Sequence, residues 1–291
     1  RAFEMQKSKA HELIGLVQSG IDMAVRSGSP DICFAGIGLL AKIHASEGNI
    51  DLAIQQVSDF REKCSPVVNR QLHRNIDALK IWLDLLAGNM QPVAEWLGKV
   101  PNPTTVYRGV TEDRYARQRG KAPNEIINFN IADRYCYMIK VAALVFMEHY
   151  EEAWTLCMRI KGYLKEYRRT YLDIENTMLQ ALILARLGQK GWRPLMLEAF
   201  TMARQHSMVW AIAQGGGAIR KLFDDQKFLD LLAKDGVDPS EPYCRAVMKK
   251  SEQLGLFYPG FFRTVKAPAK PLTAMERRIL LLYAKGNTTE E

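Results

Sequence analysis

Apolar residues recur at spacings of three and four along most of the chain, and each such stretch ends at a glycine or a short polar break. This spacing gathers the apolar side chains on one face of a helix. Alternating apolar and polar residues, the pattern of a half-buried strand, are nearly absent. The pattern therefore predicts an all-α chain in which helices are joined by short turns.

The clearest pair of helices spans residues 39 to 60 and turns at Gly48. Ala41 and Ala53 are small enough to let two antiparallel helices approach closely, and Val57 extends the buried face of the second helix. A helix, a tight turn and a second helix with small residues at the crossing form the unit of tetratricopeptide-like arrays. We expect this stretch to be one such unit.

Three weaker copies of the unit follow. They span residues 75 to 97 with a turn at Gly88-Asn89, residues 131 to 160 with a turn at His149-Tyr150, and residues 170 to 204 with a turn at Gly188. The turns are 40 residues apart (88 − 48) in the first interval and 39 (188 − 149) in the last. This regularity predicts a tetratricopeptide-like superhelix of antiparallel helix pairs, an α-solenoid, over residues 1–258.

Two regions depart from the repeat. Residues 101–125 are polar, basic and contain prolines, so we expect a loop on one rim of the array that is functional or mobile, and the absence of a motif favours mobile. Residues 207–258 are less regular. Gly215 to Gly217 should break a helix, residues 219 to 233 should form another, and a further helix should follow Pro242.

Bulk properties narrow the class of protein. The net charge of the 291 residues is +8, which is compatible with nucleic acid, but the basic residues are spread along the chain. Apolar runs of membrane-spanning length and a signal-peptide pattern are both missing. Five cysteines without a CxxC pair argue against a disulfide framework, so we expect a cytoplasmic protein. A first residue of Arg1 suggests a piece of a longer polypeptide.

The C-terminal residues 271–291 carry a more specific pattern. Thr273 and Glu276 form a capping box, in which each side chain satisfies a backbone amide of the first helical turn. An apolar stripe at helical spacing follows, and Gly286 can end the helix in the left-handed conformation. Thr288 or Thr289 can then cap a second helix. Residues 259–270, with proline on both sides, read as a linker into this segment.

The whole string resembles the first helix and the start of the second helix of LuxR-type helix-turn-helix domains. The matching residues are Leu272, Thr273, Glu276, Arg277, Leu280, Leu282, Ala284, Gly286 and Glu291. Ala274 departs from the proline usual in that family. In such domains a later recognition helix enters the major groove. That helix would lie beyond Glu291, so no DNA-binding residue is assigned and the chain should not read DNA by itself.

Repeats, a proline-containing linker and a LuxR-type segment, in that order, resemble the C-terminal half of the large ATP-binding, maltose-activator-like LuxR regulators of the STAND class. The stretches 171–182, 198–204 and 217–224 also match that pattern. The resemblance implies a DNA-binding transcription regulator with an ATP-binding module before the repeats. This chain has no phosphate-binding Gly-x4-Gly-Lys-Ser/Thr loop, so ATP is implied only for that other module, and we expect neither enzymatic activity nor a cofactor here.

Motifs suggesting other chemistry have plainer interpretations. The spacing Gly36-x-Gly38-x-x-Ala41 matches a dinucleotide-binding fingerprint, but it lies inside a predicted repeat helix rather than after a strand. Asp224, Asp225 and Asp230 could bind magnesium, although helix capping at a turn explains them better. The five histidines show no i, i+4 pair, and His44 suits a partly buried packing position. No catalytic or metal-binding residue is therefore predicted.

The candidate ligand-binding residues are Tyr135, Met138, Tyr171 and Met178. They fall on the first helices of the third and fourth pairs, which line the concave surface of a tetratricopeptide-like superhelix. There the tyrosines could stack on a ligand and offer a hydroxyl, or all four could fill the core between helices. We expect a signal-sensing domain in which an inducer or partner protein in the groove controls self-association and transcription. The alternative is a protein–protein interaction scaffold without a small-molecule ligand.

Overall fold

The computed structural model describes residues 10–64, 70–100, 105–107, 125–127 and 134–258, together with Phe3 and Met5. The predicted linker at 259–270, the helix-turn-helix segment at 271–291 and most of the predicted loop at 101–125 lie outside the described residues. The helices of the described part are α1 Ala10–Arg26, α2 Pro30–Ser46, α3 Ile50–Lys63, α4 Arg70–Ala87, α5 Met90–Leu97, α7 Arg134–Phe146, α8 Tyr150–Glu166, α9 Thr170–Arg186, α10 Trp192–Gln205, α11 Val209–Ala213, α12 Gly216–Leu222, α13 Gln226–Lys234 and α14 Pro242–Phe257.

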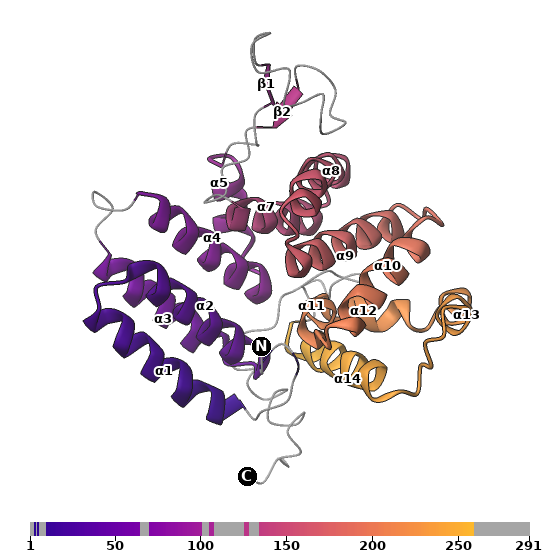
Figure 1. Ribbon diagram of the computed structural model, residues 1–291. Helices are drawn as coiled ribbons and strands as arrows, with labels where there is room; N and C mark the ends of the chain where they lie inside the picture. The colour runs from indigo at the N-terminus through magenta and orange to yellow at the C-terminus, as the bar shows by residue number, and fades with distance from the viewer. Residues whose placement is uncertain are drawn as a thin grey trace.

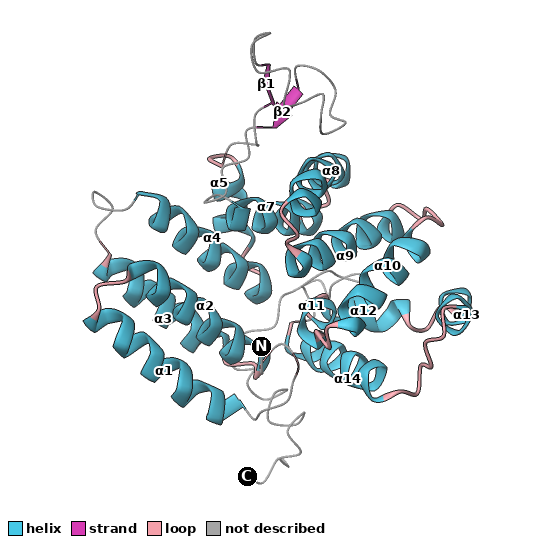
Figure 2. Cartoon of the chain, viewed as in Figure 1, coloured by secondary structure: helices cyan, strands magenta, loops and turns pink. Residues whose placement is uncertain are grey.

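The predicted turns lie where the described helices end. Gly48, Gly88 and Gly188 have φ of 80°, 78° and 68°, in the left-handed region that glycine enters without steric cost. They join α2 to α3, α4 to α5 and α9 to α10. The third pair turns without glycine, and Glu148 takes the left-handed conformation with φ of 65°. The four predicted helix pairs and the all-helical class are confirmed (Figure 2).

Three details differ from the expectation. Helix α1, which precedes the first predicted pair, was not anticipated. Residues 219–233 do not form one helix, because α12 ends at Leu222 and α13 begins at Gln226. The stretch 101–125 is not loop throughout, since β1 (Thr105–Tyr107) pairs antiparallel with β2 (Glu125–Ile127). Figure 1 shows this two-stranded ribbon projecting beyond α5 and α7, away from the other helices.

Contacts between helices define an inner row, consisting of α2, α4, α7, α9 and α11. Each member of this row contacts the next member, although an outer helix lies between most of them in the sequence. The outer helices α3, α8 and α10 each pack against the inner helices on either side of them in the chain. In Figure 1 the helices follow one another around a central region, to which α4, α7, α9 and α11 are adjacent.

Small residues set the closest helix crossings. Ala41 of α2 and Ala53 of α3 are both fully buried, as the sequence predicts. A close approach of backbone to backbone joins α12 to α14, where a Cβ built on Gly255 would lie 3.0 Å from the backbone Cα and N of Gly217. Backbone atoms cannot move aside as a side chain can, so this crossing requires glycine.

The first and last parts of the described array are joined at the C-terminal end of α2. The Lys250 ammonium on α14 donates to the carbonyl of Ser46 at 2.9 Å, and the Tyr258 hydroxyl donates to that of Ala45 at 2.7 Å. Burial lowers the pKa of Lys250, and Glu47 opposes that effect. The last carbonyls of a helix lack intrahelical partners and carry partial negative charge, so they suit a buried cation. These contacts bring α14 against α2 across 204 residues.

The Gly255 crossing gives a test of the packing. Gly255→Ala should lower the free energy of unfolding by about 1–3 kcal/mol, because the new methyl group overpacks against fixed backbone. Gly162→Ala in α8 is the matched control, since nothing lies within 4 Å of its Cβ and the helix should gain about 0.5–1 kcal/mol. Urea unfolding followed by circular dichroism measures both variants. Equal stability of the two variants would contradict this account of the α12–α14 crossing.

Candidate ligand-binding site

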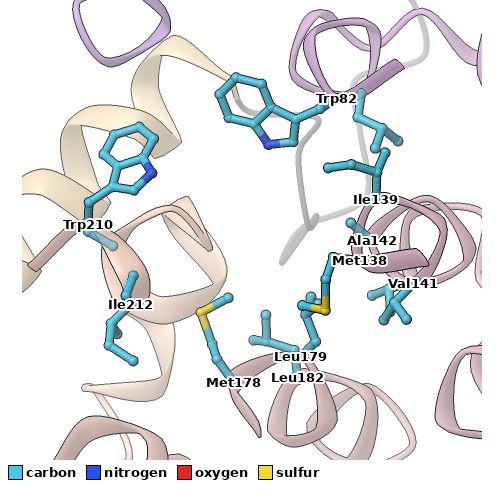
Figure 3. Packing of buried hydrophobic residues seen from close by; sticks show 14 of the residues in the cluster. Trp82, Met138, Ile139, Val141, Ala142, Met178, Leu179, Leu182, Trp210 and Ile212 are labelled. Atoms are coloured by element: carbon cyan, nitrogen blue, oxygen red, sulfur yellow. The ribbon is translucent and has the colours of Figure 1, made fainter. Parts of the chain in front are cut away.

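The four predicted site residues lie on adjacent helices of the inner row. Tyr135 and Met138 belong to α7, and Tyr171 and Met178 to α9. Met138 and Met178 are 5% and 2% exposed, and Figure 3 shows both among the buried hydrophobic residues of the core, as are Trp82 and Trp210. Tyr135 and Tyr171 are only partly buried. The structure therefore separates the set into two methionines in the core and two tyrosines at the surface of the inner row.

Tyr135 borders a hollow of about 200 Å³ between α2 and α7. Its other lining residues are Phe34, Ala35, Gly38, Leu39 and Lys42, all on α2. Phe34, Gly38 and Lys42 are spaced at i, i+4 and i+8, which places them one above another on a single helix face. The small residues Ala35 and Gly38 leave room between the aromatic ring and the ammonium group. The hollow is thus an open pocket with an aromatic part and a cationic part.

Two interactions between distant helices shape this pocket. The rings of Phe34 and Tyr135 meet edge to face, with centroids 6.0 Å apart. The Lys42 ammonium lies 5.3 Å from the centroid of the Tyr171 ring on α9. A cation over the face of an aromatic ring is attracted by the ring quadrupole. Lys42 therefore connects the pocket wall on α2 to the second predicted tyrosine.

A carboxylate lies beside these groups. Glu175 is on α9, one turn after Tyr171, and its Oε1 accepts a hydrogen bond of 2.6 Å from Gln214 Nε2. The pKa of Tyr135 is raised, first by burial and then by the negative charge of Glu175. The Tyr135 hydroxyl consequently keeps its proton at neutral pH and can donate a hydrogen bond. The site combines one cation, one anion and two phenol rings.

This arrangement can bind a ligand. Ring faces can stack on a planar or cyclic ligand, Lys42 can neutralise an anionic group, and Glu175 can accept from a hydroxyl or amide. The residues at the pocket include no nucleophile paired with a base. Across the described ranges, no three His, Cys, Asp or Glu side chains converge as metal ligands. The five cysteines are all free, and four of them are buried.

The aspartates considered for magnesium have other partners. Asp225 caps the N-terminus of α13 by accepting from the amide of Phe228, and both its oxygens accept from Arg193 at 2.9 and 2.7 Å. Asp224 forms an ion pair with Arg220. Asp230 accepts from Gln226 at 2.9 Å. The interpretation of Asp224-Asp225 as capping residues at a turn is confirmed for Asp225.

Two further sequence motifs are packing features. Gly36 and Gly38 lie within α2, which follows α1 rather than a strand, so the structural context of a dinucleotide site is absent from this part of the described chain. A Cβ on Gly36 would come within 2.5 Å of the Ile21 side chain on α1. His44 is buried, and burial lowers its pKa, which favours the neutral ring. Its predicted packing role is confirmed.

Sequence reasoning missed Phe34, Lys42 and Glu175. The repeat pattern could have identified Phe34 and Lys42 on α2. The first helix of the first pair should line the inner surface just as the first helices of the later pairs do. Glu175 follows Tyr171 by four residues and shares its face. A second hollow, of about 220 Å³, is lined by Glu151, Glu152, Thr155, Leu156 and Arg159. All of these lie on α8, and no other described residue lines this hollow.

Asp225 provides a test that separates capping from metal binding. The pKa of this carboxyl falls from 3.8 to about 2, chiefly because Arg193 donates to it. Its contribution to stability is therefore present above about pH 4 and is lost as the pH falls through 2. Asp225→Ala should lower the free energy of unfolding at pH 7 by about 1 kcal/mol through loss of the cap. Asp225→Asn, which can still cap, should lose less, and its difference from the wild type should vanish between pH 4 and pH 2.

Asp230→Asn is the matched control, because Asp230 is exposed and bonds only to Gln226 among the described side chains. Thermal unfolding with and without millimolar Mg²⁺ completes the measurement. We expect no Mg²⁺-dependent rise in melting temperature. A rise that Asp225→Asn abolishes would show a metal site instead.

Comparisons with known proteins found no relative of this chain. No protein family, no curated protein and no solved structure matches this chain. No helix of the described part combines the length and the apolar character needed to cross a membrane. The function must therefore be inferred from the residues of this chain.

Proposed function

We propose that this chain is the effector-binding part of a LuxR-type transcription regulator, whose helix pairs form a tetratricopeptide-like superhelix. The order of parts in the sequence supports the proposal, with repeats first, then a proline-containing linker and then a LuxR-like segment. The contacts of the inner row also support it, since each inner helix packs against the next, as in stacked repeats. Under this proposal, ATP would bind to a separate module, and DNA would need the complete helix-turn-helix.

The observation that carries the proposal is the pocket between α2 and α7, whose Lys42 lies over the Tyr171 ring of α9. Phe34 and Tyr135 supply aromatic walls, and Lys42 supplies a cation that already contacts Tyr171. Lys42 is only partly buried, so its ammonium stays accessible to an incoming anionic group. A ring-bearing small molecule with an anionic group would complement these side chains. The sensing role follows from that complementarity.

Ligand binding at this position could control the shape of the array. A ligand touching α2, α7 and α9 would bridge the first, third and fourth helix pairs at once. The curvature of stacked repeats depends on small rotations between neighbouring units. A ligand that fits one curvature better than another shifts the population toward it by its differential affinity. In the full regulator, that shift would change the surfaces available for self-association and so control transcription.

A second function is favoured by the apolar part of the inner row. Trp82, Met138, Met178 and Trp210 are buried side chains of the inner row, and Figure 3 shows them in the hydrophobic core. Methionine and tryptophan suit adaptable contacts with peptides, because the thioether is flexible and the indole offers a large ring with one donor. A rearrangement of the inner row that uncovers them would suit a protein–protein interaction scaffold that needs no small-molecule ligand. The two functions differ in whether Lys42 matters for binding.

Ligand screening with matched lysine variants tests the sensing function. Thermal shift assays should be run with ring-bearing anions, uncharged ring compounds and acyclic anions. We expect ring-bearing anions to raise the melting temperature most. Lys42→Met should weaken their binding at least about tenfold in calorimetric titration, because a charge-assisted hydrogen bond contributes about 1.5–3 kcal/mol. Tyr135→Ala should weaken all ring-bearing compounds, whatever their charge.

Lys63→Met is the control for a general change in charge, since Lys63 is exposed at the end of α3. It should leave every affinity unchanged. Equal loss in Lys42→Met and Lys63→Met would contradict the assigned site. If no compound class shifts the melting temperature while partner peptides bind equally well to the wild type and to Lys42→Met, the scaffold function would replace the sensing function.

A further inference from the structure

Lys42 and Glu175 carry opposite charges near the same tyrosine, yet they do not pair with each other. The Lys42 ammonium on α2 lies 5.3 Å from the centroid of the Tyr171 ring. Glu175 follows Tyr171 by one turn on α9, so both side chains lie on one face of that helix. The ion pairs of the described residues include neither Lys42 nor Glu175. Each charge is therefore available to a ligand.

Gln214 orients the Glu175 carboxylate without exhausting its capacity to accept hydrogen bonds. The Gln214 Nε2 donates to Glu175 Oε1 at 2.6 Å and to the Ala211 carbonyl at 3.1 Å, so α11 fixes the position of the amide. An ionised carboxylate has two oxygens and can accept about four hydrogen bonds. Among the described residues, only Gln214 donates to Glu175. The carboxylate can thus accept from a ligand while it keeps its bond to Gln214.

Tyr135 connects this carboxylate to the hollow between α2 and α7. Its ring lines the hollow, and the nearby negative charge of Glu175 contributes to the raised pKa of its hydroxyl. Helix α9, which carries Glu175, packs against α7. A cavity of about 150 Å³ can hold a benzene molecule. The hollow of about 200 Å³ therefore has room for one ring, with the polar end of the ligand directed toward α9.

We propose that the ligand of this pocket is a zwitterion of the aromatic amino acid type, whose carboxylate pairs with Lys42 and whose ammonium donates to Glu175. The ligand ring packs against Phe34 and Tyr135, which already meet edge to face. The assignment rests on the proposed sensing function. It adds Glu175 as the residue that selects ligands with an amino group.

A ligand that carries a single charge fits the site less well. A ring-bearing acid pairs with Lys42 but brings a second negative charge toward Glu175, and like charges repel strongly where water is partly excluded. A ring-bearing amine meets the converse problem at Lys42. A zwitterion satisfies both side chains and adds no net charge to the pocket. The two protein charges together therefore discriminate against each single-charge analogue.

Three compounds that share a phenyl ring test this selectivity. They are phenylalanine, 3-phenylpropionate, which lacks the amine, and phenethylamine, which lacks the carboxylate. Calorimetric titration of the full chain measures the Kd of each compound. We expect phenylalanine to bind at least about tenfold more tightly than either analogue, because each analogue loses one charge-assisted hydrogen bond. The corresponding indole series of tryptophan, indole-3-propionate and tryptamine should show the same order.

Glu175→Gln is the decisive variant, because it keeps the size of the side chain and can still accept from Gln214. Its affinity for phenylalanine should fall at least about tenfold, whereas its affinity for 3-phenylpropionate should not fall. Lys42→Met should lose the preference for phenylalanine over phenethylamine. Glu62→Gln is the matched control, since Glu62 is exposed on α3. It should leave every affinity unchanged. The comparison of compounds on the wild type needs no variant to fold.

The outcomes separate this inference from the function on which it rests. If phenylalanine and 3-phenylpropionate bind the wild type equally well, the role of Glu175 is overturned and the sensing function stands. An equal loss of both compounds in Glu175→Gln would overturn that role as well. If other ring-bearing anions raise the melting temperature but neither zwitterion binds, the ligand class is wrong. If no ring-bearing compound binds at all, the sensing function fails together with this inference.

Discussion

The contact between α14 and the C-terminal end of α2 is the constraint on which the arrangement of the inner row depends. A stack of helix pairs need not bring its first and last members together. Here the Lys250 ammonium and the Tyr258 hydroxyl donate to the carbonyls of Ser46 and Ala45. A buried ammonium without such acceptors would be strongly unfavourable. The contact itself buries Lys250, and the Ser46 carbonyl, Glu47 and Gln253 offset the cost of that burial, so these acceptors determine where α14 meets α2.

This closure also determines the geometry of the candidate pocket. Lys42 and Ser46 are one turn apart on α2, so the helix that receives α14 also carries the cation that lies over Tyr171 of α9. Helix α2 is thereby held by elements from opposite ends of the described chain. The glycine crossing of α12 and α14 also affects this geometry, because a larger residue at Gly255 would displace α14, the helix that carries Lys250. A change in the α12–α14 packing should therefore reach the pocket through α2.

The sequence predicts the parts of this fold that depend on local chemistry. Gly48, Gly88 and Gly188 mark real turns, since only a left-handed residue reverses the chain so tightly there. The prediction of one helix over residues 219–233 was wrong although the aspartates themselves indicated a cap at a turn, because periodicity does not register a cap that pairs with Arg193 of α10. Contacts such as Lys250 with Ser46 join residues far apart in the chain, and no local pattern encodes them.

The candidate site also has residues that local sequence patterns predict and residues that they do not. Tyr135 and Tyr171 could be identified from their positions on first helices, and they do lie at the inner row, with Tyr135 lining the pocket. Met138 and Met178 satisfy the same periodicity but are buried. A helix surrounded by other helices is apolar on every side, so the spacing of its apolar residues does not show which of them face the groove and which face the core. The role of Lys42 could not be predicted, because it depends on the packing that brings the Lys42 ammonium of α2 over the Tyr171 ring of α9.

The inner row has two chemically different ends, and their connection bears on how binding could be transmitted. At one end Lys42 and the phenol rings offer charge and stacking, and at the other Trp210 offers an apolar face that Phe3 covers. Gln214 follows Trp210 by one turn and donates to Glu175, whose charge acts on Tyr135. A displacement of α11 would therefore lengthen the bond to Glu175 and change the electrostatics of the pocket. Through that one hydrogen bond, the position of α11 and the affinity for a ligand at Lys42 would influence each other, as linkage requires.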